Sequence, residues 1–373
     1  MQKRGFFLTH SPIEAHFVQN SKDFVVEETP LYEASGSGDH LFVRIRKSGV
    51  STWEALQAFS ERVGVKARDI GYAGMKDKNS MSIQTISLPK SCEGAIESFS
   101  HPQIKILAVD RHNNKLKIGH LKGNRFFIRL KKVSALSAAK IDEAVSAIDR
   151  FGMANYFGFQ RFGRDNDNYE KARAFLNGDA KIRGRKMQNF LISALQSAQF
   201  NDWLSKRIEI SHLIASFNPR EIAGELQKSD IEITIEELEN IKKQSQFFKI
   251  VNGDLMCHYP YGKFYYADDP NAEADRFAAK QIAPTGALCG HRTMSVRAVA
   301  ATIEHKFFED IPASGDRRYA WIFPENLSGK YIEKEAHYEL GFFLPKGSYA
   351  TALIEELLHS ELRNEQFSLS TDL

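Results

Sequence analysis

The residues best suited to chemistry lie in one short segment of the 373-residue chain, Gly71–Lys78, which reads GYAGMKDK. Asp77 is the single acid in it, and Lys76 and Lys78 flank this acid with positive charge, which favours an ionised carboxylate. An ionised carboxylate suits a nucleophile or a general base. The two glycines permit a tight path and the close approach of another stretch of backbone. On residue types alone, however, a Lys-Asp-Lys triplet is usually a surface turn.

Predicted elements on both sides hold this segment in place. Alternation of apolar residues from Leu41 to Ile45 predicts a strand with one face in a core. A helix is predicted after Ser51, because Ser51 and Glu54 fit a capping box that satisfies two main-chain N–H groups. The apolar residues expected on its core face are Trp53, Leu56, Phe59 and Val63. A second strand is predicted from Ser82 to Leu88, so the segment joins a helix to a strand, where active-site loops are common.

The sequence lacks the motifs of a nucleotide-binding loop, a disulfide framework and a metal site. The glycines of the segment lack the Walker spacing, and Gly36-Ser37-Gly38 leads into a strand rather than a helix, unlike a dinucleotide fingerprint. Cys92, Cys257 and Cys289 are odd in number, far apart and without paired Cys or His spacing. We therefore expect reduced thiols, with neither a disulfide framework nor a metal site.

The composition, 42% hydrophobic and 26% charged, is that of a soluble globular protein long enough for two domains. Phe6–Leu8 is the longest apolar run near the N-terminus, too short for a signal peptide or a spanning helix, so we expect a cytoplasmic protein without membrane contact. Arg111–Lys132 holds eight Lys and Arg and no acid, whereas Glu221–Glu239 holds seven acids and one Lys. The first region could face phosphates, although such a run is equally consistent with a solvated face.

The coarse pattern mixes strands and helices without a regular βαβ alternation, which predicts an α+β fold. A second helix is predicted over Ser137–Phe151. From residue 152 to 320 the pattern is more helical, including a run from Arg185 to Ile208, and it then returns to strand-like alternation. This change of pattern indicates a separate second domain, and the return to strand-like alternation is consistent with its insertion within the first domain.

The segment from Gly71 to Gln84, GYAGMKDKNSMSIQ, closely resembles the signature of the TruD family of tRNA pseudouridine synthases, in which the Asp of a Gly-x-Lys-Asp motif is catalytic. The resemblance places that role on Asp77. The further segments that resemble family motifs, in the family's order, are Asp23–Glu28, Gly123–Phe126, Asn155–Gly163, Pro284–Gly290 and Phe343–Thr351. The departures from the family pattern are Ser82 for a common Thr, Cys289 for a usual Pro, and Glu355-Glu356 for an Arg-Glu pair. The resemblance spans nearly the whole chain.

The resemblance implies a pseudouridine-synthase-like catalytic domain with a mixed, largely antiparallel sheet, formed by residues 1–151 and 321–373. It also implies an inserted α/β domain specific to the family, residues 152–320. It implies an isomerase that converts uridine in tRNA, uridine-13 in this family, to pseudouridine without a cofactor. The reaction needs a carboxylate near the sugar C1′ and the base C6, a pocket for the detached uracil, and a nucleotide flipped out of its helix. The expected partner is tRNA, and we expect a monomer with no obligate protein partner.

The resemblance also implies a set of substrate-binding residues. In the family, the positions of Phe24, Asn124, Phe126 and Tyr349 line the substrate site. Asn124 and Phe126 are two apart on a predicted strand, so one can hydrogen-bond the base and the other can stack on it. On pattern alone, Phe24 and Phe126 read as core strand residues and Tyr349 as a turn-packing aromatic. The other candidates are Lys76, Lys78, Gln84, Asn155 and Arg161; the last two lie in a segment that is alternatively a structural hinge.

Two other functions compete with this hypothesis. One is a tRNA-binding or tRNA-folding chaperone that keeps the fold without chemistry, against which the retention of Asp77 between two lysines argues. The other is a methyltransferase or a deaminase acting on RNA. The lack of a dinucleotide-type glycine loop and of a zinc ligand cluster makes that second alternative less favourable.

Overall fold

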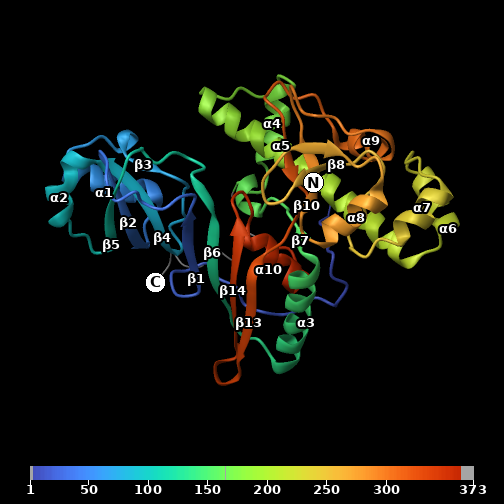
Figure 1. The fold of residues 1–373 in the computed structure, drawn as a ribbon, viewed down its shortest axis with the longest axis horizontal. Helices are drawn as coiled ribbons and strands as arrows, with labels where there is room; N and C mark the ends of the chain where they lie inside the picture. The colour runs from blue at the N-terminus through green and yellow to red at the C-terminus, as the bar shows by residue number, and fades with distance from the viewer. Residues whose placement is uncertain (1–2, 164, 363–373) are drawn as a thin grey trace. The chain divides into compact units, whose positions relative to one another are not determined.

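The structure is a computed structural model that describes residues 3–163 and 165–362 (Figure 1). These residues form two compact units, each assembled from separate stretches of the chain. One unit consists of Glu14–Val145 and Pro324–Gly347, and we call it the sheet unit. The other consists of Ser146–Phe323 with the described parts of Met1–Ile13 and Ser348–Ser368, and we call it the helical unit.

A large sheet organises the sheet unit. Its strands follow the order β13-β14-β6-β1-β4-β2-β5, and β3 pairs with β4. β1 and β4 are parallel and the other neighbouring pairs are antiparallel, which confirms the predicted mixed, largely antiparallel sheet. The strands are β1 (Phe24–Pro30), β2 (His40–Ser48), β3 (Gly71–Tyr72), β4 (Met81–Pro89), β5 (Ile104–His112), β6 (Leu121–Leu130), β13 (Glu325–Ile332) and β14 (His337–Pro345).

Two helices, α1 (Thr52–Val63) and α2 (Glu93–Glu97), pack on one face of the sheet over β2 and β4 (Figure 1). The predicted capping box is present, because Ser51 Oγ accepts from the Glu54 N–H and the Glu54 carboxylate accepts from the Ser51 N–H. Leu56 and Phe59 are buried in the core as predicted. The expectation for Trp53 was wrong, since its side chain is 45% exposed. Position 53 lies in the first turn, beside the solvent-facing Glu54 rather than over the sheet.

The helical unit is built around α5 (Arg185–Ser216), which contains the predicted run from Arg185 to Ile208. Its Trp203 packs closely on Gly286 of the central strand β10, where a Cβ atom would lie 2.1 Å from the indole. The strands are β7 (Met153–Ala154), β8 (Leu255–His258), β9 (Phe264–Tyr266), β10 (Ile282–Leu288), β11 (Asp316–Tyr319) and β12 (Trp321–Ile322). The other helices are α4 (Asn168–Leu176), α6 (Pro219–Gln227), α7 (Ile235–Lys242), α8 (Pro270–Ala278), α9 (Ala298–Glu304) and α10 (Ala350–Leu358).

The architecture confirms the predicted α+β class. Helix α3 (Ala135–Phe151) confirms the second predicted helix, beginning two residues before the predicted start. The described parts of Met1–Ile13 and Ser348–Ser368 belong to the helical unit, although both segments lie within the predicted catalytic body. The predicted boundaries between the catalytic body and the inserted domain, after residues 151 and 320, stay a prediction. Among the described residues, no helix is both long and apolar enough to cross a membrane.

Candidate active site

The loop that carries Asp77 is fixed through its main chain. It connects β3 to β4 in the sheet unit, and the Asp77 side chain is exposed. Lys47 Nζ donates to the carbonyl oxygens of Lys76 and Asp77, both at 3.2 Å, and Ser80 Oγ donates to the Asp77 carbonyl at 3.0 Å. Among the described residues, none donates a hydrogen bond to the Asp77 carboxylate. The carboxylate is therefore held in place by its backbone while its oxygens stay available for a substrate.

The close packing around Gly71 requires a glycine at this position. A Cβ atom at Gly71 would lie 2.3 Å from Ser87 Oγ and 2.4 Å from the Leu116 carbonyl oxygen, so no larger residue fits. This is the close approach of another backbone that the glycines predict. The chain therefore enters the loop through a strand, β3, that fits closely between β4 and the segment before β6.

Lys47 was not recognised from the sequence. It lies on β2, its side chain is fully buried, and its ammonium also donates to the Val50 carbonyl at 2.7 Å. A signal was present, because Lys47 continues the alternation of Leu41, Val43 and Ile45 toward the covered face of the sheet. A lysine at a position of core parity indicates a buried cation with a structural task.

Burial lowers the pKa of Lys47 to about 8, from an ordinary value of 10.5. Because the folded value lies below the unfolded one, the neutral amine contributes stability that is present above pH 10.5 and is lost as the pH falls toward 8. The wild type should gain stability over Lys47→Met between about pH 8 and pH 10, by an amount on the order of 2–3 kcal/mol. Urea unfolding of both proteins across this range measures the difference. A constant difference would contradict the low pKa.

The lysines on either side of Asp77 are both held by other acids. Lys76 is buried, and its Nζ lies 3.1 Å from Glu28 Oε2, whose own side chain is 2% exposed. The Lys76 N–H donates to Thr52 Oγ1 at 2.7 Å, which ties the loop to the start of α1. Lys78 lies 3.0 Å from Glu54 at the surface. Both lysines flank Asp77 in sequence as expected. The ammonium of Lys76 is paired with Glu28 and that of Lys78 with Glu54, so their charges are not directed only at Asp77.

Glu54 joins the helix start to the loop. Its carboxylate accepts from the Ser51 N–H at 2.6 Å and from Lys78 Nζ at 3.0 Å. These two contacts, the main-chain one first, lower the pKa of Glu54 to about 2. The capping box thus positions Lys78 as well as α1.

One face of the sheet gathers the other candidates in this unit. The β1–β6 register pairs Val26 with Phe126 and Glu28 with Asn124, so their side chains share the face on which Phe24 also lies. The Phe126 ring lies 6.1 Å from that of Phe24. It is also stacked at 5.3 Å on Phe342 of β14, which was not predicted. Phe126 and Asn124 are half-buried, whereas Phe24 is buried.

Gln84 lies on the same face but deeper. It is 1% exposed, and its Oε1 accepts from Thr52 Oγ1 at 2.9 Å beneath the Lys76 turn. Its Nε2 atom and the Asn124 Oδ1 atom are buried without a hydrogen-bond partner among the described residues. One amide donor and one amide acceptor are thus unsatisfied on the sheet face that bears Phe126, and unsatisfied buried polar groups are costly unless a ligand or water pairs with them.

The remaining candidates, Asn155, Arg161 and Tyr349, belong to the helical unit. Asn155 is buried and joined to β11, since its Nδ2 donates to the Tyr319 carbonyl at 2.9 Å and its Oδ1 accepts from Arg318 at 2.8 Å. Phe157 is the centre of this group. The residues around its ring are Tyr349 with ring centroids 5.9 Å apart, Arg161 at 5.9 Å and Arg318 at 3.9 Å. Arg318 was not predicted, because a strand arginine far along the chain carries no local signal.

Among the described residues, no group of three or more His, Cys, Asp or Glu side chains is arranged to hold a metal ion. The three cysteines are buried and are not joined in disulfides. Arg129 and Lys131 of the basic region both contact the Asp23 carboxylate, at 3.3 Å and 2.5 Å, so part of that region is neutralised within the fold.

Comparison with known proteins identifies the class and then the family. A solved structure of a putative tRNA pseudouridine synthase D from Methanosarcina mazei superposes with a TM-score of 0.65 over 97% of both chains, and at 19% identity this shows a shared fold. The family model for tRNA pseudouridine synthase D (TruD) matches residues 1–182. A tRNA pseudouridine synthase D from Nitratiruptor sp. is 50% identical over 97% of this chain and 99% of that protein, and one from Wolinella succinogenes is 48% identical over the same shares. The chain belongs to the tRNA pseudouridine synthase D family, which confirms the predicted enzyme class, an isomerase.

Proposed function

We propose that this isomerase converts uridine-13 of tRNA to pseudouridine, with Asp77 as its catalytic carboxylate and without a cofactor. Pseudouridine synthesis in tRNA is the activity for which its relatives are named. The observation that supports Asp77 is an exposed carboxylate on a loop whose main chain is locked by Lys47, Thr52 and Ser80. A fixed group with available oxygens needs little reorganisation when the substrate arrives.

The chemistry fixes what Asp77 has to reach. The N1–C1′ bond breaks, the uracil turns, and a C5–C1′ bond forms; the hydrogen on C5 is lost to solvent and N1 takes up a proton. The carboxylate can attack C1′, attack C6, or act as a base at the sugar, and each role places it beside the same nucleotide. No electron acceptor and no transferred group enter this balance.

The face around Phe126 supports a uracil-binding pocket. Uracil presents an N3–H donor between two carbonyl acceptors. Asn124 Oδ1 and Gln84 Nε2 are an acceptor and a donor of the complementary kinds, and pairing with the base requires both buried atoms to become accessible. Phe126 supplies an aromatic surface on the same face, and the ring of Phe342 on the neighbouring strand β14 stacks beside it. Stacking on such a ring offsets part of the free energy needed to flip the nucleotide.

Phe126→Ala is expected to lower kcat/KM by between roughly 5-fold and 150-fold, the equivalent of a stacking contribution of about 1–3 kcal/mol. Phe127→Ala is the matched control, because Phe127 is the next residue of β6 and faces the other side of the sheet. Steady-state kinetics with a tRNA transcript measures both. Equal losses in the two variants would point to a general packing defect instead of a base-stacking role.

The proposed reaction is tested by tritium release. A tRNA transcript labelled with tritium at C5 of uridine should release label when incubated with the protein in EDTA without added cofactors. A transcript that carries cytidine at position 13 should release none. Release from both transcripts would place the reaction at another uridine, and release from neither would favour a tRNA-binding protein without chemistry.

Three further predictions belong to this proposal. We expect a cytoplasmic enzyme that acts as a monomer. We also expect residues 1–151 and 321–373 to supply the catalytic body, and residues 152–320 to supply an inserted domain.

A further inference from the structure

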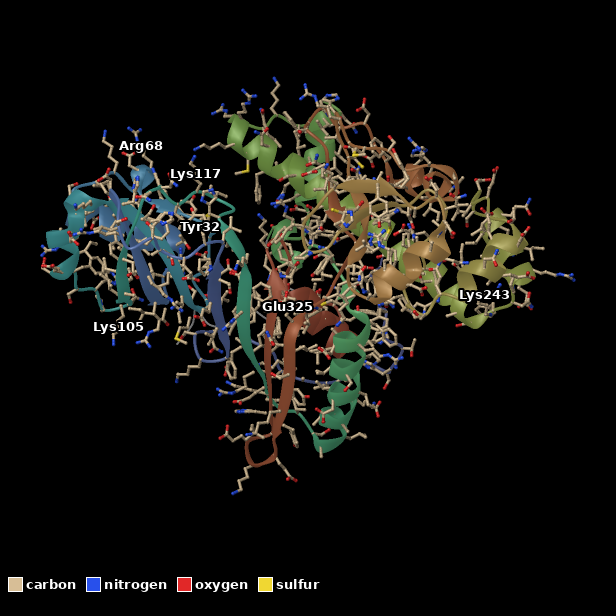
Figure 2. All side chains as sticks on the ribbon, viewed as in Figure 1. Tyr32, Arg68, Lys105, Lys117, Lys243 and Glu325 are labelled. Atoms are coloured by element: carbon tan, nitrogen blue, oxygen red, sulfur yellow. The ribbon has the colours of Figure 1, made fainter. Side chains whose placement is uncertain are left out.

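The sheet unit has a concave site that the proposed reaction does not use. It is an open pocket of about 710 Å³, and the residues on which the argument rests are Tyr32, His40, His112, Lys115, Lys117 and His120. Figure 2 shows Tyr32 and Lys117 in the same part of the sheet unit. The β2–β5 register pairs His40 directly with His112, which explains how histidines that are scattered in the sequence meet here.

The walls of this pocket are held in fixed positions by their own contacts. The Tyr32 and His112 rings are stacked 4.9 Å apart at an interplanar angle of 16°. A hydrogen bond of 2.7 Å joins Tyr32 Oη to His120 Nδ1, and the Ser35 N–H donates to His112 Nδ1 at 3.2 Å. A site arranged in advance loses less conformational entropy when it binds a ligand.

The charge of the pocket fits an anion. None of the described residues that line it is acidic, and neither Lys115 nor Lys117 forms an ion pair within the described part of the chain. Lys115 is half-buried and Lys117 is exposed. Two unpaired ammonium groups beside amide and imidazole side chains are donors of the kind that bind phosphate oxygens of nucleic acid.

The pocket is physically connected to the proposed catalytic loop. The Gly119 N–H donates to the Ala73 carbonyl at 2.8 Å, and Ala73 begins the loop that carries Asp77. Leu116 packs with Ala73, Phe42 and Leu121 in one buried cluster, and the pocket residue Tyr32 packs against this cluster. After His120 the chain enters β6 directly. This strand carries Asn124 and Phe126, the two candidates for binding uracil. The same stretch of chain therefore supplies the pocket lysines and leads into the candidate uracil site, whose Asn124 and Phe126 lie on the face of the sheet opposite to His40 and His112.

We propose that this pocket is a second RNA-binding site, which binds a phosphodiester of the substrate outside the target nucleotide through Lys115 and Lys117. The inference rests on the proposed function in one respect, that the substrate is tRNA. The role of the pocket is to position the RNA, so removing its charges should change tRNA affinity and KM and not the chemical step.

The test compares two double variants of the full chain. Lys115→Gln/Lys117→Gln removes the pocket charges. Lys66→Gln/Lys105→Gln removes two exposed lysines of the same unit that do not line the pocket, and Figure 2 shows Lys105 well away from Tyr32 and Lys117. The dissociation constant for an unmodified tRNA transcript is measured by filter binding at several salt concentrations.

The pocket variant should bind tRNA several-fold more weakly than the control variant. The slope of log K against log salt should become shallower by about 0.7–0.9 for each phosphate that the protein no longer neutralises. If the double variant does not fold, Lys117→Gln alone, at an exposed position, should still make the slope shallower by the amount that corresponds to about one phosphate. Equal affinity and equal slope in the pocket and control variants would overturn the inference. Filter binding does not depend on product formation, so the two proposals can fail separately. A protein that makes no pseudouridine but shows this difference in binding would contradict the proposed reaction and still support the proposed RNA-binding site.

Discussion

Asp77→Asn is expected to lower kcat by roughly 10³-fold or more, since an amide neither attacks a sugar or base carbon effectively nor accepts a proton at neutral pH. The variant should fold and bind tRNA nearly as well as the wild type. The reason is structural: the loop is held through main-chain carbonyls, and no described residue donates a hydrogen bond to the carboxylate that the change removes. Single-turnover kinetics and filter binding measure the two quantities separately.

The matched control for this prediction is Asp110→Asn, which changes an exposed carboxylate on β5 of the same unit. It should leave kcat near the wild-type value. Parallel loss of tRNA binding and turnover in Asp77→Asn would contradict a catalytic role and would indicate that the acid maintains the shape of the loop.

The second large effect is expected at Glu28. Glu28→Ala leaves the Lys76 ammonium buried without its counterion, and removing one partner of a buried ion pair costs about 3–5 kcal/mol. Glu27→Ala is a closely matched comparison, because Glu27 is the adjacent residue of β1 and pairs with Arg44 at the surface. That exposed pair should contribute less than about 1 kcal/mol. Urea denaturation of both variants measures the free energies of unfolding.

A double variant separates the charge from the packing. Lys76→Met/Glu28→Leu removes both buried charges and should recover much of the stability that Glu28→Ala loses, since no uncompensated ion remains. Equal destabilisation by Glu28→Ala and Glu27→Ala would show that Lys76 is not a buried cation in need of this partner.

Local signals in the sequence predicted the elements that hold Asp77. The capping box at Ser51, the alternation from Leu41 to Ile45 and the glycines of the loop each depend on residues close together in the chain. Such signals act through local backbone geometry, so they can be recognised without knowledge of contacts between distant residues. The α+β class followed from the mixture of strand and helix patterns along the chain, whereas the inserted domain and the role of Asp77 were taken from resemblance to a family.

Contacts between distant residues could not be predicted in this way. Glu28 is 48 positions before Lys76, and only the folding of β1 beside β4 brings them together. Read from the sequence, Lys76 and Lys78 were both charges available to the site, because nothing in the chain indicates that acids on β1 and α1 neutralise them. The sequence likewise does not indicate that the histidines at positions 40 and 112 lie together, since a strand pairing sets their proximity. Lys47 was also not predicted, although the alternation along β2 carries a signal for its burial.

The measurement that tests the central claim most directly is a nucleotide-resolution map of pseudouridine in an unmodified tRNA transcript. The transcript is incubated in EDTA with purified wild-type protein or with Asp77→Asn, then treated with carbodiimide and copied by primer extension, which stops at labelled pseudouridine. A new stop at uridine-13 with the wild type and none with Asp77→Asn is the predicted result. A stop with both proteins would contradict the catalytic role of Asp77. No stop from well-folded wild type across several tRNAs would contradict the proposed reaction.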